Sequence, residues 1–298
     1  MNAVGIDLGG TQIKGVLVGC DRTVLRREVR ATEDDGGDSM KWASAVRDLA
    51  DELGRDLGAG LSAPGLAARD HRSIASMPGR LHGIEGLDWS AFLGRGSFVP
   101  VTNDAHASLL GEAWIGAARG LRDAIMLTLG TGVGGAILSD GKLMLGHIGR
   151  AGHLGHICLD VRGVSSIVGT PGALECAIGN YNIRERTAGR FDTTHALIAA
   201  FREDDEFARG VWLASIRALA CAIASFVNIL DPEAVVIGGG IAQAGDALFE
   251  PLRDELARIE WRPAGHAVRI IPAALGEWAG AIGAARESLR MASSTAVQ

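Results

Sequence analysis

Residues 3–18 read AVGIDLGGTQIKGVLV, two apolar runs that flank the turn Gly9-Gly10-Thr11. Each run has the length and aliphatic composition of a strand, and adjacent glycines are typical of a tight turn, so we expect an antiparallel hairpin. Residues 124–138, AIMLTLGTGVGGAIL, repeat this pattern around a second Gly/Thr turn. We therefore predict two related halves, each of which opens with an apolar strand and a glycine-rich hairpin.

Further strands and helices follow these hairpins, and together they predict an α/β fold. Strands are expected at 23–29, 97–102, 234–240 and 268–273, and helices at 38–57, 104–117, 172–187, 193–203, 205–230, 244–258 and 277–291. The stretch 146–172 is rich in glycine and is expected to be irregular. We place an N-terminal lobe at 1–118, completed by the helix 277–291, and a C-terminal lobe at 119–276.

The composition narrows the class of partner. Apolar residues make up 47% of the 298 residues, which allows a sizeable core, and the net charge of −6 without a basic run argues against nucleic acid. The four cysteines are scattered and form no CxxC pair, which favours a reducing cytoplasm. The most apolar long window, 211–230, contains Arg217 and Asn228, so we interpret it as a buried amphipathic helix and expect no membrane span.

The first hairpin carries groups suited to a phosphate. Backbone N–H groups of adjacent glycines approach an anion closely, so Gly9 and Gly10 are candidate phosphate ligands, and Thr11 and Lys14 add donors. Asp7 stands at the end of the strand and suits Mg²⁺ held through water. The alternative is a plain glycine-rich hairpin whose aspartate forms an ion pair, and the motif alone does not decide between the two.

Two more glycine clusters follow apolar strands. The second turn precedes another strand and lacks a Lys-Ser/Thr ending, which argues against both a Rossmann loop and a P-loop. The third cluster lies between a strand and a helix, where a nucleoside can lie flat on the backbone. We interpret the clusters as two phosphate turns and a nucleoside ledge, the second turn being Gly130, Thr131 and Gly132 and the ledge Gly238, Gly239 and Gly240.

Several motifs in a fixed order resemble the ROK family of bacterial sugar kinases and repressors, part of the actin-like ATPase superfamily. They are DLGGTQIK, TNDAHASLLGE, LTLGTGVGGAIL with DGKL, and VVIGGGIAQAGDALFEPLRDEL, within a resemblance that runs from residue 3 to about 290. The resemblance implies a two-lobed, ribonuclease H-like α/β fold with the active site in the interlobe cleft. It also implies ATP with Mg²⁺ as phosphoryl donor, and a glucokinase-like or N-acetylmannosamine kinase-like activity on a hexose or N-acetylhexosamine. We also expect a homodimer.

The resemblance assigns a role to Asn103-Asp104. Asp104 matches the family's catalytic base, which takes the proton of the attacking sugar hydroxyl, and Asn103 matches a residue that hydrogen-bonds the sugar. An attacking alcohol needs an oriented proton acceptor, which supports this interpretation, although Asp104 could instead cap its helix. Gly65 matches a turn glycine near the sugar. It could equally belong to a bare turn.

The stretch 149–160, GRAGHLGHICLD, departs from the family. His156 matches a zinc-binding histidine and Glu175 a sugar-binding glutamate, but the three cysteine positions hold Ser166, Val168 and Ala173. Zinc needs three or four ligands at compatible spacing, so we expect no zinc. His153 stands where the family has a glutamate that accepts hydrogen bonds from the sugar. We predict a remodelled sugar wall of His153, His156 and Glu175; the alternative is that both histidines only brace the loop.

Three functions remain in view. The leading hypothesis is an ATP-dependent sugar kinase. The second is a sugar-sensing regulator, although the first phosphate motif starts at residue 7 and leaves no room ahead of it for a helix-turn-helix. The third is a sugar-binding protein without catalysis, which the changes at 153, 166, 168 and 173 favour and the retention of Asp7 and Asp104 opposes.

Overall fold

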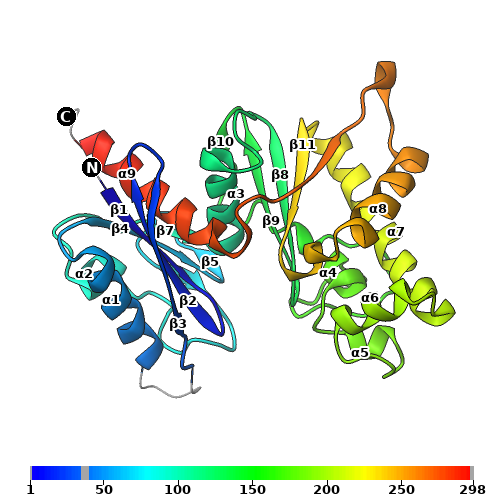
Figure 1. Ribbon diagram of the computed structural model, residues 1–298, viewed down its shortest axis with the longest axis horizontal. Helices are drawn as coiled ribbons and strands as arrows, with labels where there is room; N and C mark the ends of the chain where they lie inside the picture. The colour runs from blue at the N-terminus through cyan, green and yellow to red at the C-terminus, as the bar shows by residue number, and fades with distance from the viewer. Residues whose placement is uncertain (1, 35–39, 296–298) are drawn as a thin grey trace. The chain divides into compact units, whose positions relative to one another are not determined.

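The computed structural model describes residues 2–34 and 40–295, which form two compact units. The first unit contains the described residues up to Gly120, the segment Leu145–Ala151 and the residues from Ala274 on. The second contains Leu121–Met144 and Gly152–Ala273. Figure 1 shows the helices and strands of each unit along the chain.

The first unit is built on a five-stranded mixed sheet, whose strand order is β3-β2-β1-β4-β7. The strands are β1 (Asn2–Leu8), β2 (Gln12–Gly19), β3 (Val24–Ala31), β4 (Gly58–Ala63) and β7 (Val101–Asn103). The predicted hairpin is confirmed, since β1 pairs antiparallel with β2 from Asn2 opposite Gly19 to Leu8 opposite Ile13. β3 continues this meander, whereas β4 and β7 run parallel to β1.

The second unit repeats this topology, in the order β10-β9-β8-β11-β12. The strands are β8 (Ala124–Leu129), β9 (Val133–Ser139), β10 (Lys142–Leu143), β11 (Ala234–Gly238) and β12 (Arg269–Pro272). β8, β9 and β10 form the antiparallel meander, and β11 and β12 run parallel to β8. The two sheets therefore have the same strand order and directions, as the repeated sequence pattern predicts.

The helices differ from the sequence prediction at several places. Those of the first unit are α1 (Lys41–Gly54), α2 (Trp89–Leu93), α3 (Asp104–Ile115) and α9 (Ala279–Thr295), beside a short pair β5 (Leu66–Ala67) and β6 (Ile74–Ser76). Those of the second are α4 (Leu174–Ile178), α5 (Ile183–Arg186), α6 (Thr194–Arg202), α7 (Glu206–Leu230) and α8 (Asp246–Ile259). The single helix predicted over 172–187 is wrong, because α4 and α5 are separate. The first predicted helix was expected to begin at residue 38, which lies outside the described residues.

β4 is a central strand that the sequence pattern missed. Its residues, GAGLSA, include two glycines and two alanines, which have low strand propensity. The strand is nevertheless buried, and a Cβ added to Gly60 would lie 2.1 Å from the carbonyl oxygen of Ala284 in α9. Small residues are present here because a helix backbone lies directly against the strand.

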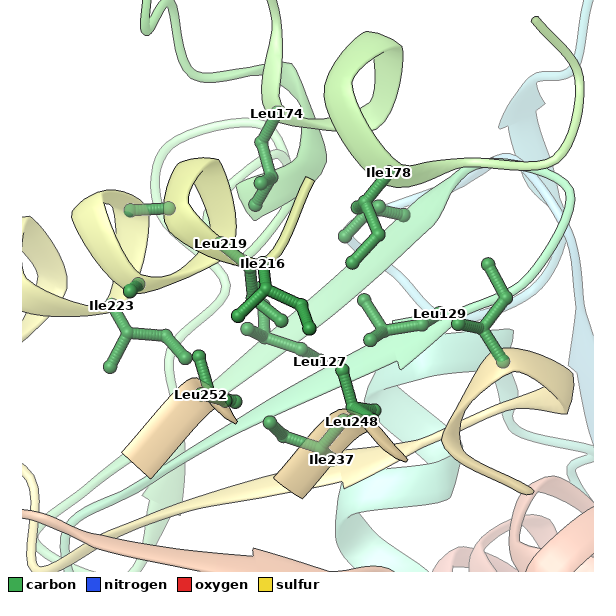
Figure 2. Packing of buried hydrophobic residues seen from close by; sticks show 14 of the residues in the cluster. Leu127, Leu129, Leu174, Ile178, Ile216, Leu219, Ile223, Ile237, Leu248 and Leu252 are labelled. Atoms are coloured by element: carbon green, nitrogen blue, oxygen red, sulfur yellow. The ribbon is translucent and has the colours of Figure 1, made fainter. Parts of the chain in front are cut away.

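The core of the second unit lies between its sheet and the helices α4, α7 and α8 (Figure 2). α7 contributes Trp212, Ile216, Leu219 and Ile223 to this core, each fully buried. By length and composition α7 could cross a membrane. These four apolar side chains lie on the buried side of α7, whereas Ile229 is exposed, and this one-sided pattern agrees with the amphipathic helix predicted over 211–230.

In the first unit, α9 approaches the backbone of three other elements. A Cβ added to Gly283 would lie 1.8 Å from the carbonyl oxygen of Ala107 in α3, and one added to Gly5 in β1 would lie 1.9 Å from that of Ala281. A Cβ added to Gly111 in α3 would lie 2.4 Å from the carbonyl oxygen of Ala279. The chain's last helix therefore packs against its first strand and against α3 through glycines.

Replacing Gly283 with alanine tests this packing. The added methyl group meets a backbone oxygen, which cannot move without shifting α3, so we expect a loss of about 1–3 kcal/mol in the free energy of unfolding. Gly210→Ala is the matched control, because Gly210 lies in α7 with open space around it. It should stabilise the protein by up to about 1 kcal/mol through helix propensity. Urea titrations would measure the free energy of unfolding of each variant. If Gly283→Ala were as stable as the wild type, the close packing would be contradicted.

Candidate active site

Asp7, near the end of β1, is half-buried in the first unit. The hydroxyl of Ser62, in the neighbouring strand β4, donates to its Oδ1 at 2.6 Å. A Cβ added to Gly280, in the first turn of α9, would lie 2.8 Å from the carboxylate, so the helix end approaches it closely. Desolvation by the surrounding protein raises the pKa of Asp7 to about 6, opposed by the Ser62 hydrogen bond. The negative charge of Asp104 also raises this pKa, and Lys14 lowers it.

The first glycine turn is fixed by backbone contacts. Gly9 N–H donates to the carbonyl of Gln12 at 2.9 Å, which closes the turn. Thr32, fully buried just past β3, donates its hydroxyl to the Gly9 carbonyl at 2.7 Å and its N–H to the Thr11 carbonyl at 3.0 Å. Thr32 therefore holds the carbonyls on one side of the turn. Sequence reasoning missed this residue, because no motif marks it.

Lys14, the other predicted phosphate donor, lies on β2 beside this turn. Its Nζ is 3.3 Å from a carboxylate oxygen of Glu277, whose side chain is 58% exposed. An ion pair with so exposed a partner is weak and exchanges readily for a stronger anion. Glu277 therefore competes with a phosphate for the Lys14 ammonium group, but a phosphate can displace it.

Asn103 and Asp104 take different roles at the start of α3. The Asn103 side chain caps the helix, accepting from the N–H groups of Ala105 and His106, and its amide donates to the carbonyl of Gly65 at 2.9 Å. Asp104 is the first residue of the helix and is exposed. The Asp104 carboxylate also accepts from the Ala105 N–H at 2.8 Å, so both side chains take part in the helix start, and the alternative that Asp104 caps its helix stays a prediction. Asn103 also joins the predicted turn glycine, Gly65, to the helix of the predicted base.

In the second unit, the second glycine turn is held by the break between α4 and α5. Asn180 N–H donates to the carbonyl of Gly130 at 3.0 Å, and Tyr181 N–H to that of Thr131 at 2.9 Å. The backbone must leave the helical path to make these bonds, which explains the failed prediction of one helix. Gly179 begins the break, and a Cβ there would lie 2.8 Å from the Thr131 oxygen.

The ledge glycines lie against the same turn. Gly239 has a positive φ of 88°, and a Cβ added to it would lie 2.3 Å from the carbonyl oxygen of Leu129, the residue before the turn. Only glycine fits both conditions. The structure thus brings two of the three predicted glycine clusters together within one unit.

Glu175 connects this turn to the histidines. Its side chain is almost fully buried at the start of α4, with Oε2 only 2.8 Å from where a Cβ on Gly132 would be, and its Oε1 lies 3.2 Å from Nδ1 of His156. The rings of His153 and His156 stack with centroids 6.4 Å apart. The predicted wall residues of the second unit are therefore neighbours.

The loop of residues 157–174, which contains Ser166, Val168 and Ala173, is held together by backbone hydrogen bonds. Leu159 N–H donates to the Gly172 carbonyl at 2.9 Å, and Ser166 N–H to the Thr170 carbonyl at 2.8 Å. Val168 is exposed, whereas Ala173 is fully buried. Across residues 2–34 and 40–295, no group of three or more His, Cys, Asp or Glu side chains is arranged to hold a metal ion.

The structure gathers the predicted residues into two groups, one in each unit. The first holds the carboxylates, the first glycine turn, Lys14, Asn103 and Gly65, and the second holds the second turn, the ledge and the wall. Sequence reasoning missed Ser62, because a lone serine carries no signal until its strand partner is known.

Comparison with known proteins decides the family. The model of the ROK family matches residues 3–288, nearly the whole chain. The chain belongs to the ROK family. The glucokinase of Thermotoga maritima is 32% identical over 96% of both chains. The N-acetylmannosamine kinase of Escherichia coli O157:H7 is 29% identical over 96% of this chain and 97% of that one.

Solved structures of ROK proteins agree with the fold. The ROK hexokinase of Thermus thermophilus has 30% identity and a TM-score of 0.84, over 96% of this chain and 98% of that one. A ROK glucokinase from Streptomyces griseus, in complex with glucose and AMPPNP, has 27% identity and a TM-score of 0.80, over 97% and 100%. The predicted fold class, the mixed α/β fold of actin-like ATPases, is confirmed, and these relatives place the chain among the sugar kinases of the ROK family.

The raised pKa of Asp7 predicts a pH-dependent cost. The pKa of Asp7 is raised from its ordinary value of 3.8 to about 6 on folding. Its contribution to stability is therefore fully present at pH values below 3.8 and is lost as the pH rises through about 6. Asp7→Asn removes the buried charge and keeps an acceptor for Ser62. Without metal or nucleotide, it should raise the Tm at pH 8 by on the order of a few °C, a gain that shrinks toward pH 4.

Asp21→Asn is the control for this experiment. The pKa of Asp21 is lowered by hydrogen bonds from the backbone and hydroxyl of Thr23, so its replacement should bring no gain at pH 8. Calorimetric melting curves at pH 4, 6 and 8 would measure both variants. A Tm gain for Asp7→Asn that does not depend on pH would contradict the burial of this charge.

Proposed function

We propose that this protein transfers the γ-phosphoryl group of ATP to a hydroxyl group of a hexose, with Asp104 as the general base. The observation that carries the proposal is the position of Asp104 on the unit of the first glycine turn. Its carboxylate is exposed at the start of α3, the helix cap is supplied by Asn103, and its charge acts on Asp7. An N-acetylhexosamine is the alternative acceptor, supported by the N-acetylmannosamine kinase among the relatives.

The chemistry is an in-line displacement. The sugar oxygen attacks the γ-phosphorus, the new O–P bond forms as the bond between this phosphorus and the β,γ-bridging oxygen breaks, and ADP leaves. The hydroxyl proton passes to the Asp104 carboxylate. A proton acceptor must be accessible to the attacking hydroxyl, and the Asp104 carboxylate is exposed at the start of α3.

The residues around Asp7 fit Mg²⁺ bound with ATP. Mg²⁺ keeps most of its waters and uses one or two protein carboxylates together with substrate phosphates, so it needs no cluster of three side-chain ligands. The Asp7 carboxylate is poorly solvated and compensated mainly by one hydroxyl, as its raised pKa indicates. A cation there would restore its ionised form. When bound, Mg²⁺ would supply charge neutralisation on the phosphates.

The remaining assignments follow the two groups of residues. Gly9, Gly10, Thr11 and Lys14 on the first unit would bind phosphate, and Gly130, Thr131 and Gly132 on the second would do the same. Gly238, Gly239 and Gly240 would support the adenosine. Asn103 and Gly65 would approach the sugar, together with the wall residues His153, His156 and Glu175. A homodimer located in the cytoplasm completes the proposal, which includes no zinc.

Replacing Asp104 with asparagine tests the base. Asparagine keeps the size and polarity of the side chain but cannot accept the proton, so turnover should fall by roughly 10²–10⁴-fold while the KM for ATP changes little. ATP consumption would first be screened with hexoses and N-acetylhexosamines to find the acceptor. Asp70→Asn, which removes an exposed carboxylate that only binds a neighbouring N–H, serves as control and should keep full turnover.

Two outcomes would overturn this proposal in different ways. Near-normal turnover of Asp104→Asn would remove Asp104 from the chemistry. If no sugar supports ATP consumption but a sugar binds by calorimetry, the protein is a sugar-sensing member of the family without catalysis.

Exchange of His153 tests the sugar wall. A neutral imidazole offers one donor and one acceptor, whereas a carboxylate only accepts, so His153→Glu should change which sugar is preferred and leave the KM for ATP nearly unchanged. His153→Ala should raise the sugar KM by about 10-fold, since one lost hydrogen bond is worth about 1 kcal/mol or more. Unchanged sugar selectivity and sugar KM in both variants would make His153 a loop brace.

A further inference from the structure

Arg80 covers the first glycine turn. Its Nη2 lies 1.9 Å, and its Nη1 2.7 Å, from the point that a Cβ on Gly10 would occupy. The guanidinium group therefore lies directly on the Gly10 backbone, in a space that any side chain at residue 10 would fill. Arg80 and Gly10 belong to the same unit but are 70 residues apart in the chain (80 minus 10).

The loop that carries Arg80 is fixed on both sides. Leu81 is fully buried in the core of the first unit, and its N–H donates to a carboxylate oxygen of Asp34 at 3.1 Å. On the other side, Met77 N–H donates to Glu85 Oε1 at 2.6 Å. Asp34 lies two residues after Thr32, the residue that holds the first glycine turn. The same short segment thus braces both the turn and the arginine loop.

Among the described residues, the Arg80 guanidinium and two of the turn's three N–H groups have no hydrogen-bond partner. In the described part of the chain, Arg80 makes no hydrogen bond and no ion pair, and the N–H groups of Gly10 and Thr11 donate to no acceptor. The turn's carbonyls, in contrast, are engaged by Thr32. Two unused N–H donors and one cation therefore gather at one turn, a composition that suits an anion with several acceptor oxygens.

We propose that Arg80 binds the terminal phosphate of the nucleoside triphosphate at the first glycine turn. Guanidinium presents several N–H donors in a plane and stays protonated, so it suits a tetrahedral phosphate better than an ammonium group does. The inference rests on the proposed function, and it adds a phosphate ligand from a loop that none of the glycine motifs contains. Contact with the transferring group would also place the cation where negative charge must be neutralised during transfer.

An exposed arginine can also rest on a glycine without binding anything. In that case its removal would leave every anion affinity unchanged. If Arg80 binds the terminal phosphate, its removal should weaken the binding only of molecules that carry a chain of phosphates. The binding of AMP, which lacks the β- and γ-phosphates, should not change.

Calorimetry with three probes would separate these cases. Wild type, Arg80→Gln, Arg80→Lys and the control Arg119→Gln would be titrated with AMPPNP, AMP and inorganic tripolyphosphate in the presence of Mg²⁺. Arg119 is a suitable control because it is exposed, lies in the same unit and makes no side-chain hydrogen bond or ion pair with the residues that are described. Melting curves would show that the variants are folded.

We expect Arg80→Gln to weaken AMPPNP and tripolyphosphate binding by roughly 10–100-fold and to leave AMP binding unchanged, the range for one charge-assisted contact. Arg80→Lys should retain part of the affinity, and Arg119→Gln all of it.

The role of Arg80 would be overturned if Arg80→Gln bound AMPPNP as tightly as the wild type does, or if it lost as much affinity for AMP as for AMPPNP. If wild type binds tripolyphosphate in an Arg80-dependent way but neither nucleotide, the proposed use of ATP fails and the role of Arg80 stands. If wild type binds none of the probes, both fail.

Discussion

The contact between α9 and the backbones of β1, β4 and α3 is the constraint on which the first unit depends. Gly5, Gly60, Gly111 and Gly283 allow this contact, since a methyl group at any of them would meet a carbonyl oxygen within 2.4 Å. β1 carries Asp7 and α3 carries Asp104, so one helix fixes the elements of both carboxylates. The same helix brings Gly280 close to Asp7. The position of α9 thus determines the surroundings of Asp7.

Two aspartates on one unit acquire different properties from their surroundings. Asp7 lies at a strand end among packed backbones, and its desolvation raises its pKa, whereas Asp104 stands exposed at a helix start whose cap is provided by its neighbour. A carboxylate that is costly to ionise suits a cation, and one that is exposed is accessible to a substrate hydroxyl. The difference arises from packing and not from residue type.

The loop of residues 157–174 in the second unit is closed by its own backbone hydrogen bonds. Backbone hydrogen bonds between residues 157–159 and 172–174 tie its ends, and those around Ser166 close its tip. Glu175 follows directly and lies between the second glycine turn and His156. This buried acid therefore joins the end of the loop to the second glycine turn.

The sequence by itself determined the repeated hairpins, the long helices and the family, because strand alternation, helical spacing and glycine turns are local signals. It also identified Asn103 and Asp104 as a pair, but only the structure showed that Asn103 is the N-cap residue. The tertiary structure alone decided the rest. The central strand β4 has weak local propensity and forms because α9 covers it, and α4 ends early because Asn180 and Tyr181 bond to the second glycine turn. Thr32, Ser62 and Arg80 reach their partners across 23, 55 and 70 residues (32 minus 9, 62 minus 7 and 80 minus 10), distances over which no periodicity or motif carries information.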